Sequence, residues 1–188
     1  MHDVFIAPLN ISNNDLLQRV INELRKILSA KIRTTELSLD LKKSYSSERN
    51  QYYSTQIIAE AVDQTDHLDG KVVLLVDFDL YIPVFTFVFG EAQLNGKHSI
   101  VSLCRLHEEF YTGKTDDVLL LDRIIKEILH ELGHNFGLLH CNNWDCVMHS
   151  SSIIEEVDIK GGNYCSECIK SLPVVNNNRF RFWSGQRP

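Results

Sequence analysis

Eleven consecutive residues, 130–140, constrain this chain more than any other feature, because they match the pattern HExxHxxGxxH. His130 and His134 are four residues apart, so on a helix both imidazoles leave the same face and can hold one metal ion. If the helix continued, His140 would lie about 240° around the axis from His134 and could not reach that ion. The helix must therefore end first. Gly137 lies where the break is needed, because glycine adopts the left-handed backbone conformation at little steric cost.

Glu131 directly follows His130, and this position predicts a catalytic metal site. Three histidines leave the fourth position of a tetrahedral zinc ion open for water, which Glu131 could reach as a general base. HExxH alone also arises by chance on amphipathic helices, where histidine and glutamate form a solvated face. Gly137 and His140, both in register, favour the metal site over that interpretation.

Four cysteines follow His140 as a CxxxxC pair and a CxxC pair: Cys141, Cys146, Cys165 and Cys168. Four thiolates at these spacings suit a closed, tetrahedral zinc site that stabilises structure where a short segment cannot build an apolar core. Two disulfides or a redox CxxC are the alternatives. They are disfavoured because no thioredoxin-like strand precedes the CxxC and the chain looks intracellular. Cys104 is interpreted as a buried apolar residue.

Two residues near the cysteines have competing interpretations. Met148 could be ordinary core filler, but after HExxHxxGxxH it can form a turn beneath the metal. His149 is an alternative third metal ligand, and His140 is preferred because it is in register with the motif.

Composition limits the classes of function. The 188 residues, 44% of them hydrophobic, are enough for one well-packed domain. A net charge of -6 argues against nucleic acid as a partner, because nucleic-acid binding needs clustered positive charge. The first eight residues lack the basic region of a secretory signal, and no apolar stretch approaches a membrane span, so we expect a cytoplasmic, monomeric protein with no membrane partner.

Hydrophobic periodicity predicts alternating strands and helices, and hence a mixed α/β fold. Predicted strands cover residues 3–9, 31–41 and 72–76, and predicted helices cover 12–29 with Ser12 as the cap, 55–64, and 115 to the break at Gly137. The polar interval 42–53 is expected to be a surface loop.

A hairpin is predicted between residues 83 and 103. Its first arm, 83–90, begins at Pro83, and the Asn95-Gly96 turn connects it to a second arm, 99–103. Because proline is awkward in a central strand, the first arm is placed at a sheet edge, where it could pair with an extended peptide. An ordinary core strand with inward-facing aromatic residues is the alternative.

The run HELGHNFGLLHCNNWDCVMHSSSIIEEVDIKGGNYCSEC, residues 130–168, resembles the archaemetzincins, a branch of the metzincin zinc metalloproteases. The resemblance implies a metzincin-like (zincin) fold. A twisted mixed sheet and long helices would form an upper lobe over residues 1–137, and a small zinc-stabilised lower lobe would cover 138–172. Residues 173–188 are expected to be a loosely ordered tail.

The resemblance also implies two Zn²⁺ ions per chain. A catalytic zinc would be held by His130, His134 and His140, and a structural zinc by Cys141, Cys146, Cys165 and Cys168. Met148 would form the turn beneath the catalytic ion, and substrate would extend along the edge strand, within residues 84–92.

We therefore expect a zinc metallopeptidase that acts on peptide or protein substrates. Its reaction would be hydrolysis of a peptide bond through a zinc-bound water, with Glu131 as general base. Tyr164 or Tyr111 could supply an additional oxyanion donor. One alternative is a zinc-bound peptide-binding module with little or no turnover, which would have no need of Glu131. A zinc-stabilised nucleic-acid binder is opposed by the negative net charge.

Overall fold

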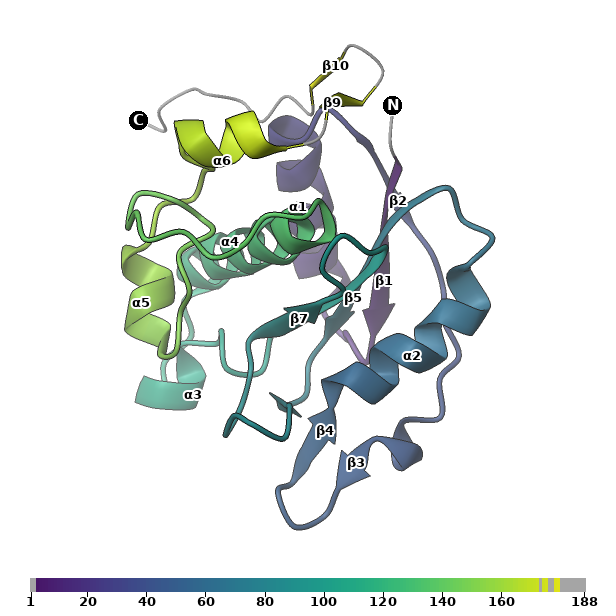
Figure 1. The fold of residues 1–188 in the computed structure, drawn as a ribbon. Helices are drawn as coiled ribbons and strands as arrows, with labels where there is room; N and C mark the ends of the chain where they lie inside the picture. Colours follow the sequence, from purple (N-terminus) through teal and green to yellow (C-terminus); the bar gives the residue numbers. More distant parts are fainter. Residues whose placement is uncertain (1–2, 173, 176–177, 180–188) are drawn as a thin grey trace.

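A five-stranded sheet in the order β2-β1-β5-β8-β7 forms the centre of the molecule (Figure 1). The computed structural model describes residues 3–172 and, as backbone, 174–175 and 178–179. Four strands run parallel: β1 (Asp3–Leu9), β2 (Lys31–Thr34), β5 (Gly70–Val76) and β8 (His98–Ser102). The fifth strand, β7 (Gly90–Ala92), pairs antiparallel with β8 and forms one edge. Its outer side is therefore available for a further strand.

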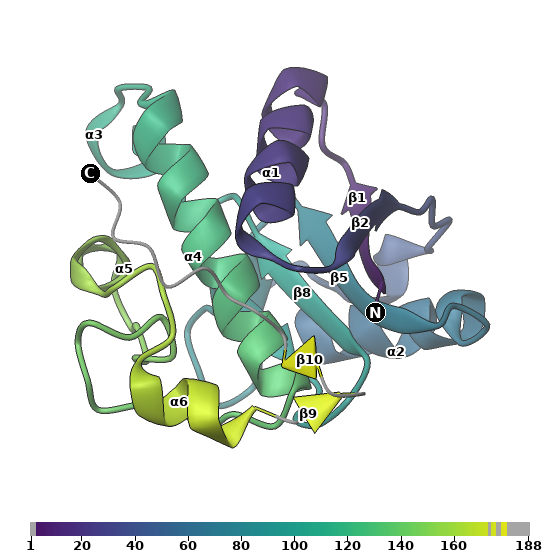
Figure 2. The ribbon, with the colours of Figure 1, turned by 90° about the horizontal axis from the view of Figure 1, so that it is seen from above.

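Helices cover both faces of this sheet (Figure 2). Helices α1 (Asn14–Ile27) and α4 (Asp117–Asn135) lie on one face, and α2 (Ser54–Thr65) lies on the other. Side chains of a strand point alternately to the two faces, so Val4 packs with α1 and α4 while its neighbour Phe5 packs with α2. Burial on both faces accounts for the nearly continuous apolar sequences of the central strands.

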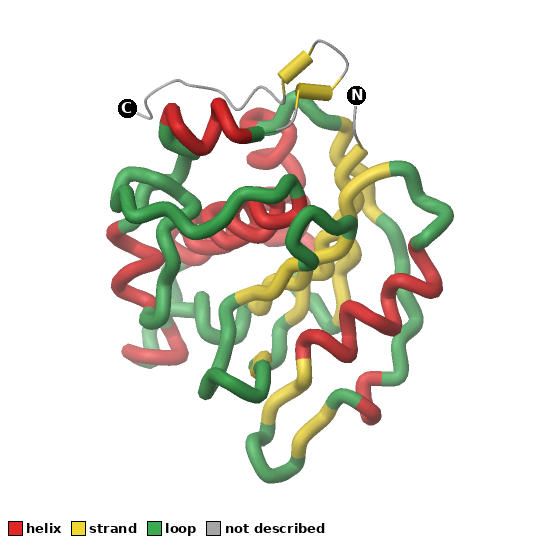
Figure 3. Tube along the Cα trace, in the orientation of Figure 1, coloured by secondary structure: helices red, strands yellow, loops and turns green. Residues whose placement is uncertain are grey.

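Smaller elements complete the fold. They are the 3₁₀ helix η1 (Leu41–Lys43), a small sheet of β3 (Tyr45–Ser46), β4 (Gln51–Tyr53) and β6 (Leu80–Tyr81), and helices α3 (Glu109–Thr112), α5 (Ile154–Ile159) and α6 (Ser166–Ser171), with β9 (Val174–Val175) and β10 (Asn178–Arg179) near the C-terminus. Beyond α4 the chain is mostly loop and crosses in front of that helix (Figure 3). Apart from β9 and β10, the expected tail lies outside the described residues. None of the described helices is both long and apolar enough to cross a membrane.

Most predicted elements are confirmed, but several of their details are wrong. The cap of α1 is Asn13, not Ser12, since the Asn13 side chain accepts a hydrogen bond from the Leu16 amide at 3.0 Å. The predicted strand 31–41 ends at Thr34. The alternating leucines beyond it, Leu37, Leu39 and Leu41, pack against the core beside α2 without forming a strand. The interval 42–53, expected to be loop, contains the β3–β4 hairpin.

The larger predicted hairpin is confirmed at the sheet edge, but its first arm was placed too early. The strand is β7, residues 90–92, and most of 83–89 is irregular apart from a bridge between Val88 and Leu80. Pro83 is thus not part of a strand. The predicted turn is present, with Asn95 at a φ of 58°, a left-handed conformation that asparagine tolerates.

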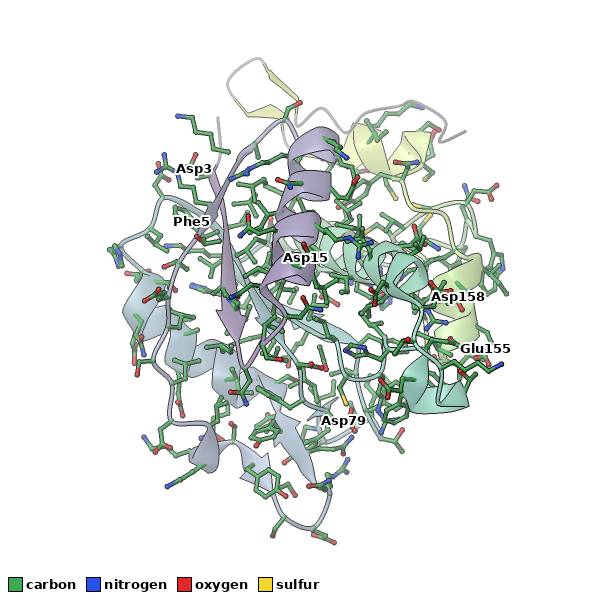
Figure 4. The ribbon with its side chains drawn as sticks, turned by 180° about the vertical axis from the view of Figure 1, so that it is seen from behind. Asp3, Phe5, Asp15, Asp79, Glu155 and Asp158 are labelled. Carbon is green, nitrogen blue, oxygen red and sulfur yellow. The ribbon has the colours of Figure 1, made fainter. Side chains whose placement is uncertain are left out.

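Arg123 links α4 to the chain that follows it. Its side chain is 2% exposed and donates to Asp158 of α5 through Nε at 2.6 Å and to Glu108 at 2.9 Å. A further hydrogen bond reaches the Leu106 carbonyl at 3.0 Å. Asp158 projects from α5 toward α4 (Figure 4). The guanidinium therefore fixes α5 against the central helix.

Arg123→Met should lower the free energy of unfolding by about 2 to 3 kcal/mol, because it leaves two carboxylates without a partner. The loss is below that of a fully buried pair, since Asp158 and Glu108 are 31% and 24% exposed. Urea unfolding measures it. The control Arg19→Met removes an exposed guanidinium that contacts the Asp117 carbonyl at 3.5 Å, and it should change stability by less than about 0.5 kcal/mol. Equal effects of the two variants would contradict this role for Arg123.

Candidate active site

Helix α4 ends in a Schellman motif centred on Gly137. The Gly137 amide donates to the His134 carbonyl and the Leu138 amide to the Gly133 carbonyl, both at 2.9 Å. Gly137 has a φ of 90°, which a side chain would strain. The helix therefore breaks where the sequence predicted, and the chain that follows reverses toward the histidines.

The three histidines of the motif form one cluster, in which the candidate ligand nitrogens all lie within 4.8 Å of one another. His130 Nε2 and His134 Nε2 are 3.1 Å apart. The His140 ring lies 5.3 Å from that of His130 and 5.0 Å from that of His134, between ring centroids. His149 is not part of this cluster, because its ring stacks on Trp144 at a centroid distance of 3.8 Å.

Backbone carbonyls orient two of these rings. The Nδ1 atom of His130 lies 2.8 Å from the Val147 carbonyl, and that of His134 lies 2.7 Å from the Leu138 carbonyl. Each Nδ1 then carries the proton, so each Nε2 keeps its lone pair for a metal. Leu138 belongs to the Gly137 turn, and the helix end therefore also orients His134.

Electrostatics keep the cluster in the form that binds metals. Burial lowers the pKa of all three imidazoles, most strongly that of His130, and the positive charge of Lys160 adds to the effect. Neutral imidazole is the form that binds a metal ion. The arrangement can hold a divalent cation without first removing protons from charged rings.

Glu131 lies between α4 and the edge strand. It is 4% exposed, and a Cβ built on Gly90 of β7 would lie 2.5 Å from its Oε1 atom. Burial and the negative charge of Glu127 raise the pKa of the Glu131 carboxyl well above its usual value, and the ammonium of Lys160 opposes them. Only glycine at position 90 allows the carboxylate to approach the strand this closely.

The four cysteines form a second cluster, whose sulfurs also lie within 4.8 Å of one another. Cys141 and Cys165 are 3.8 Å apart and Cys146 and Cys168 are 3.7 Å apart, sulfur to sulfur, too far for disulfide bonds. Burial opposes ionisation of Cys165, but hydrogen bonds from the Cys168 amide and the neighbouring thiols lower its pKa to about 7. The cluster is suited to a soft metal ion.

Met148 packs against Gly133 of α4, the residue before His134. A Cβ on Gly133 would lie 2.3 Å from the Met148 sulfur and 3.0 Å from the Tyr164 ring. The Met148 carbonyl also accepts from the Cys141 amide at 2.9 Å. Met148 is fully buried, so the segment that carries it packs closely against the helix of the histidine motif.

The histidines and Glu131 line one open cavity of about 650 Å³, a volume typical of ligand sites. Apolar side chains form its rim, among them Phe85, Leu94 and Leu139, which are 59%, 56% and 67% exposed. Strand β7 forms one wall. Part of its lining is polar: Glu127 and Lys160 are buried, whereas the serines at 150–152 are half-buried or exposed.

Sequence reasoning missed Lys160, Glu127 and Gly90. Glu127 could have been identified from the sequence, because it precedes Glu131 by one helical turn and lies on the same face of the helix. Lys160 and Gly90 carry no such signal, since tertiary packing alone brings them to the cavity. Asn135 was also missed. It is fully buried, and its side-chain amide donates to the Gln93 and His98 carbonyls, so it ties the helix end to the β7–β8 hairpin.

The tyrosines offered as oxyanion donors are wrong for that role. The Tyr164 hydroxyl is buried and donates to the Leu129 carbonyl, and the Tyr111 hydroxyl donates to the Arg105 carbonyl at 2.9 Å. Among the described residues that line the cavity, neither tyrosine is found.

Comparisons with known proteins point to one peptidase family. Residues 10–173 match the model of Peptidase family M54. An archaemetzincin of Pyrococcus horikoshii is 41% identical over 130 residues, 69% of each chain, and one of Saccharolobus islandicus is 36% identical over 174 residues, 90% of this chain and 92% of the relative.

Solved structures give the same result. The archaemetzincin of Archaeoglobus fulgidus superposes with a TM-score of 0.77 at 32% identity, over 90% of this chain and 99% of that one. A zinc-dependent peptidase of Methanocorpusculum labreanum has a TM-score of 0.80 at 30% identity, over 90% and 100%. Fold and site thus define a zinc metallopeptidase with a metzincin-like fold. Within that class, the chain belongs to peptidase family M54, the archaemetzincins.

Gly90→Ala should lower kcat/KM for peptide hydrolysis by about 10 to 100-fold, because the new methyl group displaces either Glu131 or β7. The Ile100 carbonyl lies only 2.8 Å from the added atom, so the strand cannot absorb it without moving. Zinc content should not change. Gly162→Ala is the control, since its Cβ would meet nothing closer than 4.0 Å. Native kcat/KM in Gly90→Ala would show that this close approach is not required.

Proposed function

We propose that this chain hydrolyses peptide bonds at a zinc ion held by His130, His134 and His140, with Glu131 as general base. The observation that carries the proposal is that one open cavity is lined by the Glu131 carboxylate and all three imidazoles. A peptide-binding module without turnover has no need of a buried carboxylate at that point, and burying one is costly.

The donor sets fit zinc. A zinc ion about 2.3 Å from four sulfurs at tetrahedral angles separates those sulfurs by about 3.8 Å. The two cysteine pairs are 3.8 and 3.7 Å apart. Three histidines suit a catalytic zinc, because they leave one position for water or substrate. We therefore propose two zincs per chain, one catalytic and one structural on Cys141, Cys146, Cys165 and Cys168.

Bound zinc would supply a Lewis acid that polarises the substrate carbonyl and acidifies a water molecule. Glu131 would accept the proton of that water and later deliver it to the leaving amine. The raised pKa of Glu131, caused first by its burial, suits a group that must both take and return a proton. The outer side of β7 would hold the peptide backbone extended beside Glu131.

The division into lobes follows from the same proposal. Residues 1–137 would form the upper lobe, with the sheet and α4, and residues 138–172 the zinc-stabilised lower lobe. The cleft between them would receive a peptide or protein, and the working unit would be a monomer.

Replacement of Glu131 by Gln should lower kcat for peptide hydrolysis by about 10² to 10⁴-fold while both zincs remain bound, because only the base is lost. Digestion of an unbiased peptide library measures turnover, and elemental analysis measures zinc per chain. Glu155→Gln, at an exposed position on α5, is the matched control and should retain native activity. Absence of cleavage by the zinc-loaded native protein would favour the binding module instead.

Cys165→Ser should weaken the histidine site as well as the cysteine site. Cys141 follows His140 directly, and the Val147 carbonyl that orients His130 lies between Cys146 and Met148. Loss of the structural metal should therefore lower the zinc affinity of the histidines by about 10 to 100-fold, as loss of a supporting hydrogen bond does elsewhere. Competition with a chelator measures it. Cys104→Ser is the control, since Cys104 is not part of the cluster. Unchanged histidine-site affinity in Cys165→Ser would defeat the coupling.

A further inference from the structure

One part of the cavity wall is a buried ion pair that the proposed chemistry does not use. Lys160 Nζ lies 2.7 Å from Glu127 Oε1, and the two side chains are 1% and 4% exposed. The contact is not aligned as a hydrogen bond, so charge alone holds the pair. Both residues line the cavity with Glu131. We call Glu127, Lys160 and Ser151 the polar floor.

The polar floor contains hydrogen-bond donors for which the protein supplies too few acceptors. An ammonium group has three N–H donors, and the only other partner of the Lys160 ammonium among the described residues is the His149 carbonyl at 3.5 Å. Lys126, the other buried lysine beside α5, differs. It reaches the Val157 carbonyl at 3.0 Å, the Asp158 carbonyl at 2.9 Å and the Asp122 carboxylate at 3.0 Å, which occupies all three donors.

Ser151 is a second, independent sign of a missing partner. Its hydroxyl is buried and has no hydrogen-bond partner among the described residues, yet the residue lines the same cavity. Buried polar groups in native proteins are almost always paired. A hydroxyl and an ammonium left in one cavity therefore call for an acceptor brought by a ligand.

The position of the polar floor identifies that ligand. Glu127 lies four residues before Glu131 on α4, which places it about 6 Å along the helix axis. Successive residues of an extended peptide are spaced by about 3.3 Å. Glu127 and Glu131 line the same cavity, so a peptide lying along β7 with its scissile bond at Glu131 would bring a side chain within about two residues of that bond over the polar floor.

We propose, on the basis of the proposed peptidase function, that the polar floor is a specificity subsite that selects an acidic side chain within two residues of the scissile bond. A carboxylate can accept from both Lys160 and Ser151 and would share the ammonium with Glu127. An apolar side chain would leave these donors buried and unpaired. A basic side chain would face the Lys160 ammonium directly.

The test uses the zinc-loaded protein and one peptide that it cleaves, resynthesised with Asp, Glu, Leu or Lys at each of the two positions on either side of the cut. Native protein should prefer Asp or Glu at one of these positions by at least about 10-fold in kcat/KM. Lys160→Met paired with Glu127→Gln, which removes both charges together, should reduce that preference to about twofold or less. Lys160→Arg, which retains donors, should keep the acidic preference. Lys126→Met, a buried lysine outside the cavity, should behave as native protein.

Two results overturn the subsite: a native preference for Leu or Lys at all of these positions, or an acidic preference that survives the double variant. Binding of the same peptides to zinc-loaded Glu131→Gln, followed by fluorescence anisotropy, measures the preference of the subsite without turnover. If no peptide is cleaved but Asp and Glu peptides bind more tightly, the proposed peptidase function fails and the subsite stands. If cleavage occurs without an acidic preference, the subsite fails and the proposed peptidase function stands.

Discussion

Helix α4 ends at Asn135 because Gly137 adopts a left-handed conformation, and the reversal that follows has three structural effects. It brings the Leu138 carbonyl to His134 Nδ1, which fixes the orientation of that ring. It returns His140 to the two histidines of the helix. It also starts the cysteine-bearing segment immediately after His140. A helix continuing by one more turn would remove all three, so the geometry of the cavity depends on a single backbone conformation.

The same reversal places the two candidate metal clusters on one short stretch of chain. The Cys141 amide bonds the Met148 carbonyl, and the Val147 carbonyl orients His130. The segment that carries the cysteines therefore also supplies the carbonyl that orients His130, although no cysteine belongs to the histidine cluster. In a segment with two short helices and little sheet, a metal held by four thiolates would replace the apolar core that normally keeps such loops rigid. The fold thereby joins the cysteine cluster to the histidine cluster through hydrogen bonds of the main chain.

Sequence periodicity predicted the central helices and strands, because burial on defined faces imposes a repeat that can be read directly. Motif spacing also led to Gly137, since the third histidine cannot reach the others without a break. Residues that tertiary packing alone brings together were beyond such reasoning. Lys160 lies far from Glu127 in sequence, and Gly90 meets Glu131 only because β7 packs against α4. The leucines within 31–41 alternate as they would in a strand, but beyond Thr34 the chain is not a strand. The pattern therefore predicts the burial of these side chains but not the conformation of their backbone.

The most direct test of this account is X-ray diffraction from crystals of the zinc-loaded protein, recorded on both sides of the zinc absorption edge. The account predicts two anomalous peaks, one among His130, His134 and His140 and one among the four cysteines. The first peak should keep an open coordination position facing Glu131. A peak at the cysteines alone, or His140 turned away from the other two histidines, would contradict the claim that the reversal at Gly137 builds the catalytic metal site.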